Sequence, residues 1–227
     1  MRLLVVLGLL AACERTPKRE LDFDLIKPEA AQLRTDTVGA GQFIDTATFV
    51  LVDARNTATE GAYVTLAGEL KDDAGKVVGE LAPQSLWIPA SEVRTFALVD
   101  SERKARPTAQ TARAIVRGAV VLPPPLVHVE EVHSFDDHGQ LVLKAWLVNE
   151  ADRAGQAMVV ATFYDGDRLL RRPFTVLQIA AKQDPAKPGT CPDLGEDKVP
   201  LASKCGVQFI GPPGATRGVI FVGDVTY

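Results

Sequence analysis

A pattern of alternating apolar and polar residues that occurs twice, 93 positions apart, constrains the fold of this chain more than any other feature. In the segment Ala62–Lys71, the apolar positions are Ala62, Val64, Leu66 and Leu70, and the polar positions between them are Tyr63, Thr65, Glu69 and Lys71. Successive side chains of a strand point to opposite faces of a sheet, so this pattern predicts a half-buried β-strand. Ala157–Tyr164 shows the same alternation in the second half of the chain.

The match extends into the neighbouring segments of both halves. The aligned pairs are Val50–Asn56 with Leu143–Asn149, Asp72–Val78 with Asp165–Leu170, and Val116–Val120 with Phe221–Val225. The first pair ends at an asparagine in both copies. The second pair is an Asp/Gly turn followed by two apolar residues, which is typical of a β-hairpin. Because order, spacing and alternation agree, the sequence predicts two copies of one β-module.

Three consecutive prolines, Pro123–Pro125, separate the two copies. A proline run favours the stiff polyproline II conformation, so we expect a short spacer between a first domain at 21–122 and a second at 126–227. Both contain strand candidates separated by turn residues, which predicts an all-β fold of two tandem immunoglobulin-like antiparallel β-sandwiches. One large barrel is the alternative. A helical turn is also expected within Pro28–Arg34.

The repeated unit resembles FxLYD-type domains, which are β-sandwich modules of microbial cell envelopes. The resemblance rests on three features: the strand that ends at an asparagine, the run Thr162–Asp165 before a turn, and the apolar pair after that turn. In the first copy, Ile88–Ser91 stands where that family has a proline-glycine turn, whereas Glu69–Asp72 replaces the aromatic pair. The resemblance implies a non-catalytic accessory module and provides no active-site residues to transfer.

The chain begins with a single arginine and a short apolar run, Leu3–Ala12. This run is far shorter than the roughly 20 residues that a transmembrane helix needs, and it predicts a secretory signal peptide. Its last residues form Leu10–Cys13, which resembles the lipobox of bacterial lipoproteins. That resemblance implies cleavage before Cys13, a diacylglyceryl group on its sulfur, and a lipidated tether at 13–20. In the similar enterobacterial lipoproteins, an aspartate directly after the lipidated cysteine retains the protein in the inner membrane. This chain has Glu14 at that position, so the resemblance implies the outer membrane.

Removal of the signal peptide, residues 1–12, takes away Arg2, so the mature chain has 24 basic residues against 29 acidic ones, a net charge of −5. Such mild acidity does not favour nucleic acid or an anionic membrane surface as a partner. We therefore expect membrane attachment to come from the lipid on Cys13.

Two cysteines remain once Cys13 is acylated, namely Cys191 and Cys205. Two cysteines with no third one left over, in an exported protein, predict a disulfide. Its ring of about 15 residues would contribute roughly 3 kcal/mol by the chain-entropy argument. A metal site is the alternative, but the pair lacks both Cys-x-x-Cys spacing and a histidine nearby in the sequence.

The predicted disulfide would close a long insertion in the second domain, residues 180–205. Loops of this length are commonly either functional or disordered, and a cross-link argues against disorder. The preferred interpretation is that the insertion only decorates the sandwich. The functional alternative is that it presents charged residues to a partner, and the candidates are Asp193, Glu196, Asp197 and Lys198.

All three histidines lie close together in the sequence, at His128, His133 and His138, among four acidic residues. Clustered imidazoles and carboxylates are the ligands that divalent metals require. On a regular strand, however, His128 and His133 would point to opposite faces, and His138 stands in a turn sequence. A solvated strand and hairpin is therefore the preferred interpretation, and a metal site is the alternative.

The sequence contains no Gly-x-Ser-x-Gly elbow, the nucleophile motif of α/β-hydrolases. We expect an envelope lipoprotein that acts as a non-catalytic scaffold or protein-binding module, without a cofactor. The expected partners are the membrane, through lipid, and another envelope protein. A small-molecule or metal-binding lipoprotein is one alternative, and an envelope hydrolase is a disfavoured one.

Overall fold

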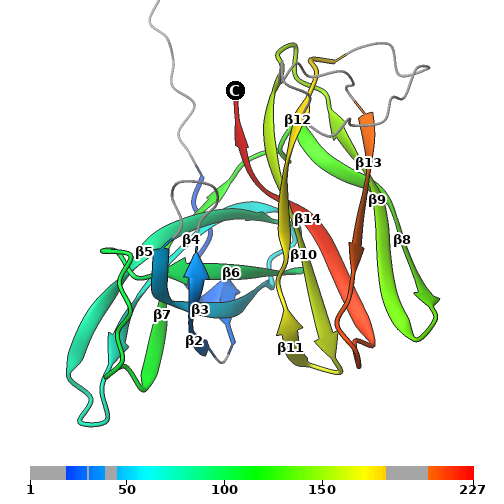
Figure 1. The fold of residues 1–227 in the computed structure, drawn as a ribbon. Coiled ribbons are helices and arrows are strands. Elements are labelled where there is room, and N and C mark those ends of the chain that lie inside the picture. The colour runs from blue at the N-terminus through cyan, green and yellow to red at the C-terminus, as the bar shows by residue number, and fades with distance from the viewer. Residues whose placement is uncertain (1–18, 30, 39–44, 183–203) are drawn as a thin grey trace, which may run out of the picture.

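The computed structural model describes residues 19–29, 31–38, 45–182 and 204–227 and confirms the all-β fold (Figure 1). The strands of the first half are β1 (Ile26–Pro28), β2 (Gln32–Val38), β3 (Asp45–Asn56), β4 (Ala62–Lys71), β5 (Val77–Ile88), β6 (Val93–Val99) and β7 (Thr111–Val121). Those of the second half are β8 (Val127–Asp137), β9 (Gln140–Asn149), β10 (Gly155–Asp165), β11 (Arg168–Arg171), β12 (Phe174–Ile179), β13 (Lys204–Ile210) and β14 (Arg217–Thr226).

In the first half, β3 is the centre of one sheet. Strands β1 and β2 pair with one edge of β3, and β6 pairs with its other edge. The second sheet has the order β5-β4-β7. All of these pairings are antiparallel, and the inner faces of the two sheets share one apolar core, which includes Val50, Leu66, Leu86, Phe96 and Ala119.

The second half repeats this topology. Strand β9 takes the place of β3, with β8 and β13 on its two edges. Strand β10 takes the place of β4, with β11 and β12 on one edge and β14 on the other. Every strand pairing among the described residues joins strands of the same half, so these strands form separate antiparallel sandwiches and not one closed barrel.

A buried asparagine ends the central strand of the first sheet in both halves. In each copy, the side-chain amide of Asn56 or Asn149 donates to the carbonyl four residues later, at 2.8 and 2.9 Å, and accepts from the N–H two residues later, at 3.0 and 2.9 Å. The same amide also donates to the carbonyl of Ile88 in the first copy and of Ala180 in the second. The predicted repeat therefore extends to individual hydrogen bonds.

A β-bulge also recurs at equivalent positions. The β4–β7 pairing shifts register between Thr65 and Leu66, and the β10–β14 pairing shifts between Met158 and Val159, which are 93 positions further on. A bulge increases the local twist of a strand. Both sandwiches therefore bend at the same point of their second sheet.

The helical turn expected within Pro28–Arg34 is wrong. The described part of this segment is extended, because β1 and β2 pair in turn with the two ends of β3. A short 3-10 turn, η1 (Phe23–Leu25), lies earlier, where the side chain of Asp22 accepts from the backbone N–H of Asp24.

Residues 19–21 run along the free edge of β7. The N–H of Val121 donates to the carbonyl of Arg19 at 2.9 Å, and the N–H of Leu21 donates to the carbonyl of Ala119 at 2.8 Å. The Arg19 side chain forms an ion pair with Glu60. The chain therefore enters the first sandwich as an added edge strand, next to the β7 end that leads into the proline run.

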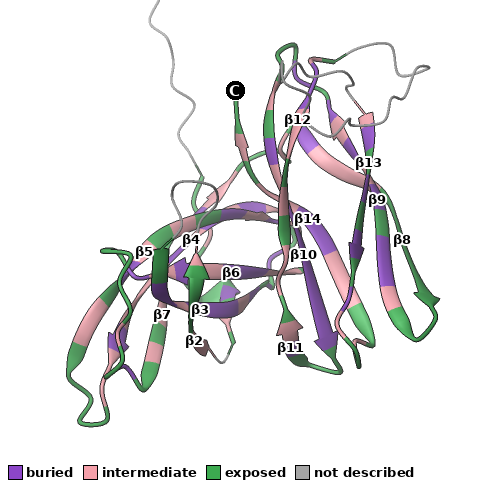
Figure 2. Ribbon diagram, viewed as in Figure 1, coloured by how far each residue is buried: buried purple, intermediate pink, exposed green. Residues whose placement is uncertain are grey.

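The two sandwiches contact each other through outer sheet faces. Val160 of β10 and Phe221 of β14 are at most 4% exposed and join the apolar cluster of the first half. Leu51 of β3 packs with Tyr164 and Leu169 of the second half. Figure 2 accordingly colours much of β10 as buried, since its inner face lies in the second core and its outer face meets the first half.

Candidate functional site

The contact between the two halves has a polar centre. The hydroxyl of Thr95 donates to Asp53 Oδ1 at 2.5 Å, the hydroxyl of Tyr164 donates to the same oxygen at 3.1 Å, and the two hydroxyls lie 2.8 Å apart. Burial, and to a smaller degree the charge of Asp53, raises the pKa of Tyr164. The phenol therefore stays protonated and remains a donor across the interface.

This contact uses different faces of the two copies. The first sandwich contributes the outer face of its β3–β6 sheet, and the second contributes the outer face of its β10–β14 sheet. The equivalent outer face of β4 in the first copy carries Glu69 and Lys71, which form a partly exposed ion pair at 2.9 Å. The positions that match them in the second copy are Thr162 and Tyr164, both at most 2% exposed. The two copies have thus diverged where they meet.

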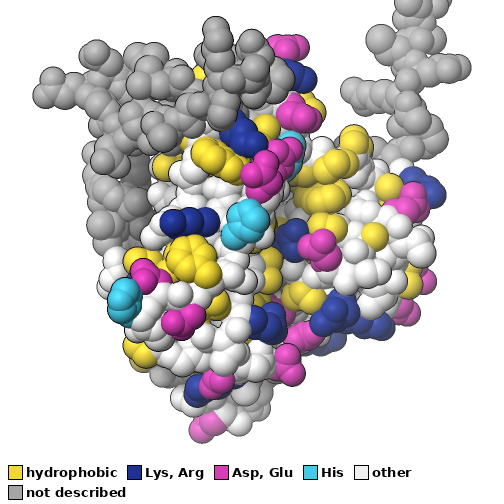
Figure 3. All heavy atoms as spheres, turned by 90° about the vertical axis from the view of Figure 1, so that its right-hand side faces the viewer, with side chains coloured by type: hydrophobic (Ala, Val, Ile, Leu, Met, Phe, Trp, Pro, Cys, Tyr) yellow, Lys and Arg dark blue, Asp and Glu magenta, His cyan; other side chains and the backbone are white. Residues whose placement is uncertain are grey.

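The face of the second copy that corresponds to the docking face of the first is open among the described residues. It is the outer face of the sheet β13-β9-β8, and we call it the Trp146 face. Its members are His133 and Phe135 of β8, Lys144 and Trp146 of β9, and Lys204, Gly206 and Gln208 of β13. Figure 3 views the side of the molecule on which β8 and β9 lie and shows apolar side chains interspersed with basic, acidic and histidine side chains.

Trp146 lies at the centre of this face, opposite Gly206 in the β9–β13 pairing. A Cβ at position 206 would lie 3.6 Å from Cζ3 of the indole, so the ring extends over the glycine. The Lys204 ammonium lies 5.3 Å from the centroid of the Trp146 ring, and the Lys144 ammonium lies 5.1 Å from that of Phe135. A depression of about 380 Å³ beside the indole is also lined by His133 and Gln208.

The prediction that His128 and His133 point to opposite faces is wrong. The β8–β9 pairing shifts register between Glu130 and His133, where Glu131 has a φ of 50°. This bulge adds one residue, so both histidines lie on the outer face, opposite Val148 and Lys144 respectively. Sequence alternation cannot show such an insertion, because it assumes two residues per repeat throughout.

The predicted hairpin at His138 agrees with the structure. His138 and Gly139 form the two-residue turn between β8 and β9, with φ values of 54° and 83°. His128 is paired with Glu130 at 3.1 Å, and His138 with Asp137 at 2.7 Å. Within the described residues, no three His, Cys, Asp or Glu side chains converge in a way that could hold a metal ion.

A cavity of about 600 Å³ lies between the halves beside the proline run. Its lining includes Trp87, Pro124, Leu126 and Phe221. Its basic side chain Arg94 already donates to Glu92 at 2.7 Å. The cavity therefore offers mainly apolar contact.

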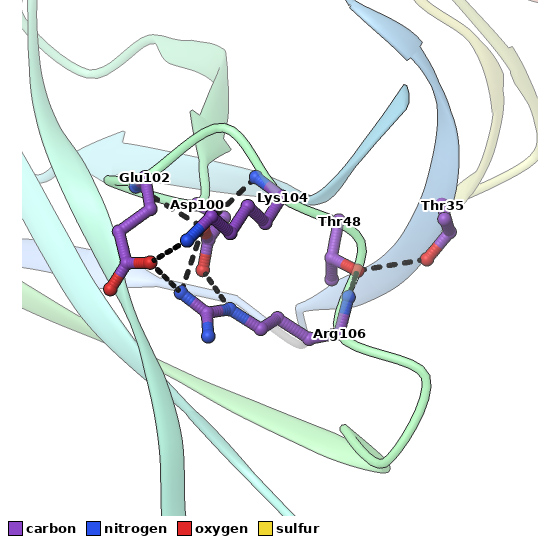
Figure 4. A network of polar contacts seen from close by, with 6 residues as sticks. All are labelled: Thr35, Thr48, Asp100, Glu102, Lys104 and Arg106. Carbon is purple, nitrogen blue, oxygen red and sulfur yellow. Dashed lines mark hydrogen bonds and ion pairs between the residues drawn. The ribbon is translucent and has the colours of Figure 1, made fainter. Parts of the chain in front are cut away.

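The loop after β6 holds a dense ion-pair network (Figure 4). The buried Asp100 carboxylate accepts from Nε of Arg106 at 2.8 Å and from the backbone N–H of Lys104 at 3.1 Å. The backbone N–H of Arg106 in turn donates to the hydroxyl of Thr48, which lies 3.0 Å from that of Thr35. These groups bond to one another, so we assign this network to holding the loop.

Several predicted sites lie outside the described residues. They are Cys13 with its lipobox, Cys191, and the four loop residues Asp193, Glu196, Asp197 and Lys198. Cys205 is described, and it is buried at the start of β13 in the second core. The disulfide stays a prediction.

The Trp146 face was not predicted from the sequence. The signal for it is present, since Lys144 and Trp146 align with Leu51 and Asp53, which form the docking face of the first copy.

No helix within the described ranges combines the length and the apolar character that crossing a membrane requires. Comparison of the sequence with protein-family models and with curated proteins finds no match.

Proposed function

We propose that this protein is a lipid-anchored envelope lipoprotein that acts as a non-catalytic protein-binding module, and that it binds its partner through the Trp146 face. The observation that carries this proposal is the equivalence of the two docking faces. In the first copy, the outer face of the sheet built on β3 holds another β-sheet. The same face of the second copy, built on β9, is open among the described residues and carries aromatic and basic side chains.

The composition of the Trp146 face supports a protein partner. Aromatic residues are enriched at the centres of protein interfaces, where a few of them supply most of the binding free energy. Phe135 is 41% exposed and Ile210, at the end of β13, is 52% exposed. Lys204 is within 4 Å of both Glu130 and Glu131, which gives the face a charged border. By analogy with the contact inside this chain, the partner would present a sheet face.

The anchor follows from the lipobox resemblance. Cys13 precedes Arg19 by six residues, and an extended chain covers at most about 3.3 to 3.6 Å per residue. Lipid on Cys13 would therefore lie within about 20 Å of the Arg19 backbone, which is fixed to β7. The sandwiches would be held close to the bilayer. From Glu14, we expect this bilayer to be the outer membrane.

Replacing Cys13 with alanine should abolish membrane attachment. Without the sulfur there is no acceptor for the diacylglyceryl group, and acyl chains contribute about 0.8 kcal/mol per buried CH₂ to membrane binding. Fractionation followed by intact-mass measurement should show wild-type protein with an acylated mass in the membrane fraction, and an unacylated precursor for Cys13→Ala. Globomycin should cause wild-type precursor to accumulate. An acylated, fully processed Cys13→Ala protein would refute the anchor.

Truncating Trp146 should weaken partner binding by about 30-fold or more, the effect of losing an interface residue worth at least 2 kcal/mol. A photo-crosslinker at the exposed position Gln208 in the native host measures this as loss of the crosslinked band in Trp146→Ala. Gly206→Gln tests the same face by adding bulk, because a Cβ there makes only ordinary contacts.

Trp87→Phe, in the other sandwich, is the matched control and should leave the crosslink unchanged. Circular dichroism should confirm that all three variants are folded. An unchanged crosslink in folded Trp146→Ala and Gly206→Gln would remove the Trp146 face from the proposal. Loss of the crosslink in Cys13→Ala alone would indicate that partner binding depends on membrane localisation and not on the Trp146 face.

A further inference from the structure

A second cavity lies between the halves, on the side of the interface where β2 faces the turn between β11 and β12. Its volume is about 470 Å³. The floor is the apolar outer face of the first sandwich, formed by Phe49, Leu51, Ala97 and Val99. Arg34 on β2 contributes one wall, and Arg171 and Arg172 of the second sandwich contribute the other. Three arginines from two sandwiches thus contribute to the lining of one groove.

Arg172 is the most constrained of these groups. Its Nε donates to the carbonyl of Thr95 at 3.0 Å across the interface. Its Nη2 is the one buried side-chain nitrogen or oxygen of the described residues that lacks a hydrogen-bond partner. Burial lowers the pKa of Arg172 to about 10, although the charge of Asp53 acts in the opposite direction. The guanidinium remains charged at neutral pH, and its Nη2 keeps an unused hydrogen-bond donor.

The other two arginines of the groove have N–H groups that are not used in hydrogen bonds with described residues. Arg34 uses Nη2 for Gln32 at 3.0 Å and for the carbonyl of Leu170 at 3.4 Å, and it forms no ion pair with a described carboxylate. The exposed side chain of Arg171 has no hydrogen bond or ion pair within the described part of the chain. Asp36 is the acidic residue of the lining, and one of its oxygens accepts from the N–H of Thr37.

Two other arginines of the first sandwich already have carboxylate partners. Arg94 is paired with Glu92, and Arg106 with Asp100. The lining of the groove has three arginines against one aspartate, and with Asp53 counted as a further carboxylate that acts on Arg172, positive charge is still in excess.

We propose that this groove binds an oxyanion, a phosphate or carboxylate group, between the two sandwiches. Guanidinium forks match the geometry of both groups, and such charge-assisted hydrogen bonds are stronger than neutral ones. The apolar floor limits solvent access on one side, which strengthens the attraction. Because the arginines come from both halves, a bound anion would link the sandwiches and stabilise them together.

The test uses inorganic phosphate and acetate as probes for the full-length protein, at constant ionic strength adjusted with chloride. At ten times the dissociation constant, a ligand raises the folded-to-unfolded ratio about 11-fold, which corresponds to a rise of ~3 to 6 °C in Tm for a chain of this size. Calorimetric titration gives the affinity directly. Stabilisation by phosphate alone would identify a phosphate ligand, and stabilisation by both anions would include carboxylates.

Arg171→Gln is the critical variant, because this exposed side chain can be changed without disturbing the interface. We expect it to weaken anion binding about ten-fold. Arg168→Gln removes the same charge from the neighbouring hairpin, where Arg168 pairs with Asp165 outside the groove, and should bind as wild type does. Equal anion binding by Arg171→Gln and wild type would overturn the proposal, as would the absence of any shift with either anion.

Discussion

Replacing Asp100 with alanine is expected to destabilise the first sandwich by about 3 to 5 kcal/mol, the usual cost of leaving a buried ion pair without one partner. The Asp100 carboxylate has no exposed surface. It accepts two hydrogen bonds from Arg106 and one each from the backbone N–H groups of Glu102 and Lys104. Alanine would leave these donors without their acceptor. Urea denaturation, followed through the fluorescence of Trp87, measures the loss.

The effect should depend on pH. Burial acts to raise the pKa of Asp100, but the hydrogen bonds from Arg106 and the backbone outweigh it and lower the pKa below its ordinary value of 3.8. The carboxylate therefore stabilises the fold at pH values above the pKa in the unfolded chain, and this contribution is lost as the pH falls through the folded-state pKa. The difference between wild type and Asp100→Ala should be largest near neutral pH and shrink below about pH 4.

Glu102→Ala is the matched control for this loop. Its carboxylate also contacts Arg106, at 3.3 Å, but it is 56% exposed, and we expect little change on its removal. Equal destabilisation by Glu102→Ala and Asp100→Ala would show that the stability of the sandwich does not depend on the burial of the Asp100–Arg106 pair.

Asn149→Ala is expected to cost about 2 to 4 kcal/mol, because it leaves buried hydrogen-bonding groups of the backbone without partners. The amide satisfies the carbonyls of Arg153 and Ala180 and the N–H of Ala151. Asn149→Asp should be at least as destabilising, since it places an acceptor against two carbonyl oxygens. The chain has two tryptophans, Trp87 in the first sandwich and Trp146 in the second. Single-tryptophan variants therefore report each sandwich separately during urea denaturation.

The equivalent change in the other copy, Asn56→Ala, provides the comparison. Each variant should shift the transition of its own sandwich by a similar amount. If the interface couples the two halves strongly, both tryptophans will report one shared transition in either variant. A folded Asn149→Ala protein with wild-type stability would show that the asparagine is not structurally required.

The fold was predictable because its main determinants are local. The alternation in Ala62–Lys71 places alternate side chains on the two faces of a strand whatever surrounds it. The hairpin turns needed only residues that tolerate positive φ, such as Gly75 and Gly139. The equivalence of Asn56 and Asn149 could also be predicted from spacing alone. The strand conformation of Pro28 and of residues 32–34 was missed because it depends on pairing with β3, which is a tertiary effect.

The candidate site was less predictable, because it depends on which sheet faces meet. Val160 and Tyr164 are apolar or aromatic residues on an outer face, and the sequence alone does not distinguish a face buried against a second sandwich from an exposed one. The bulge at Glu131 reverses the side on which His133 lies without a sequence signal such as glycine. The groove of Arg34 and Arg172 joins residues far apart in the chain, and no local motif marks it.

The pairing of residues 19–21 with β7 has a mechanical consequence for a tethered molecule. If the lipid holds one end and a partner holds the Trp146 face, tension between them enters the protein at Arg19. The backbone bonds of Arg19 and Leu21 with β7 are then loaded first, before the force reaches either sandwich core. Rupture at this short edge strand would lengthen the tether while both sandwiches stay folded. Because the pairing of residues 19–21 with β7 would break first, the Trp146 face would stay folded under load.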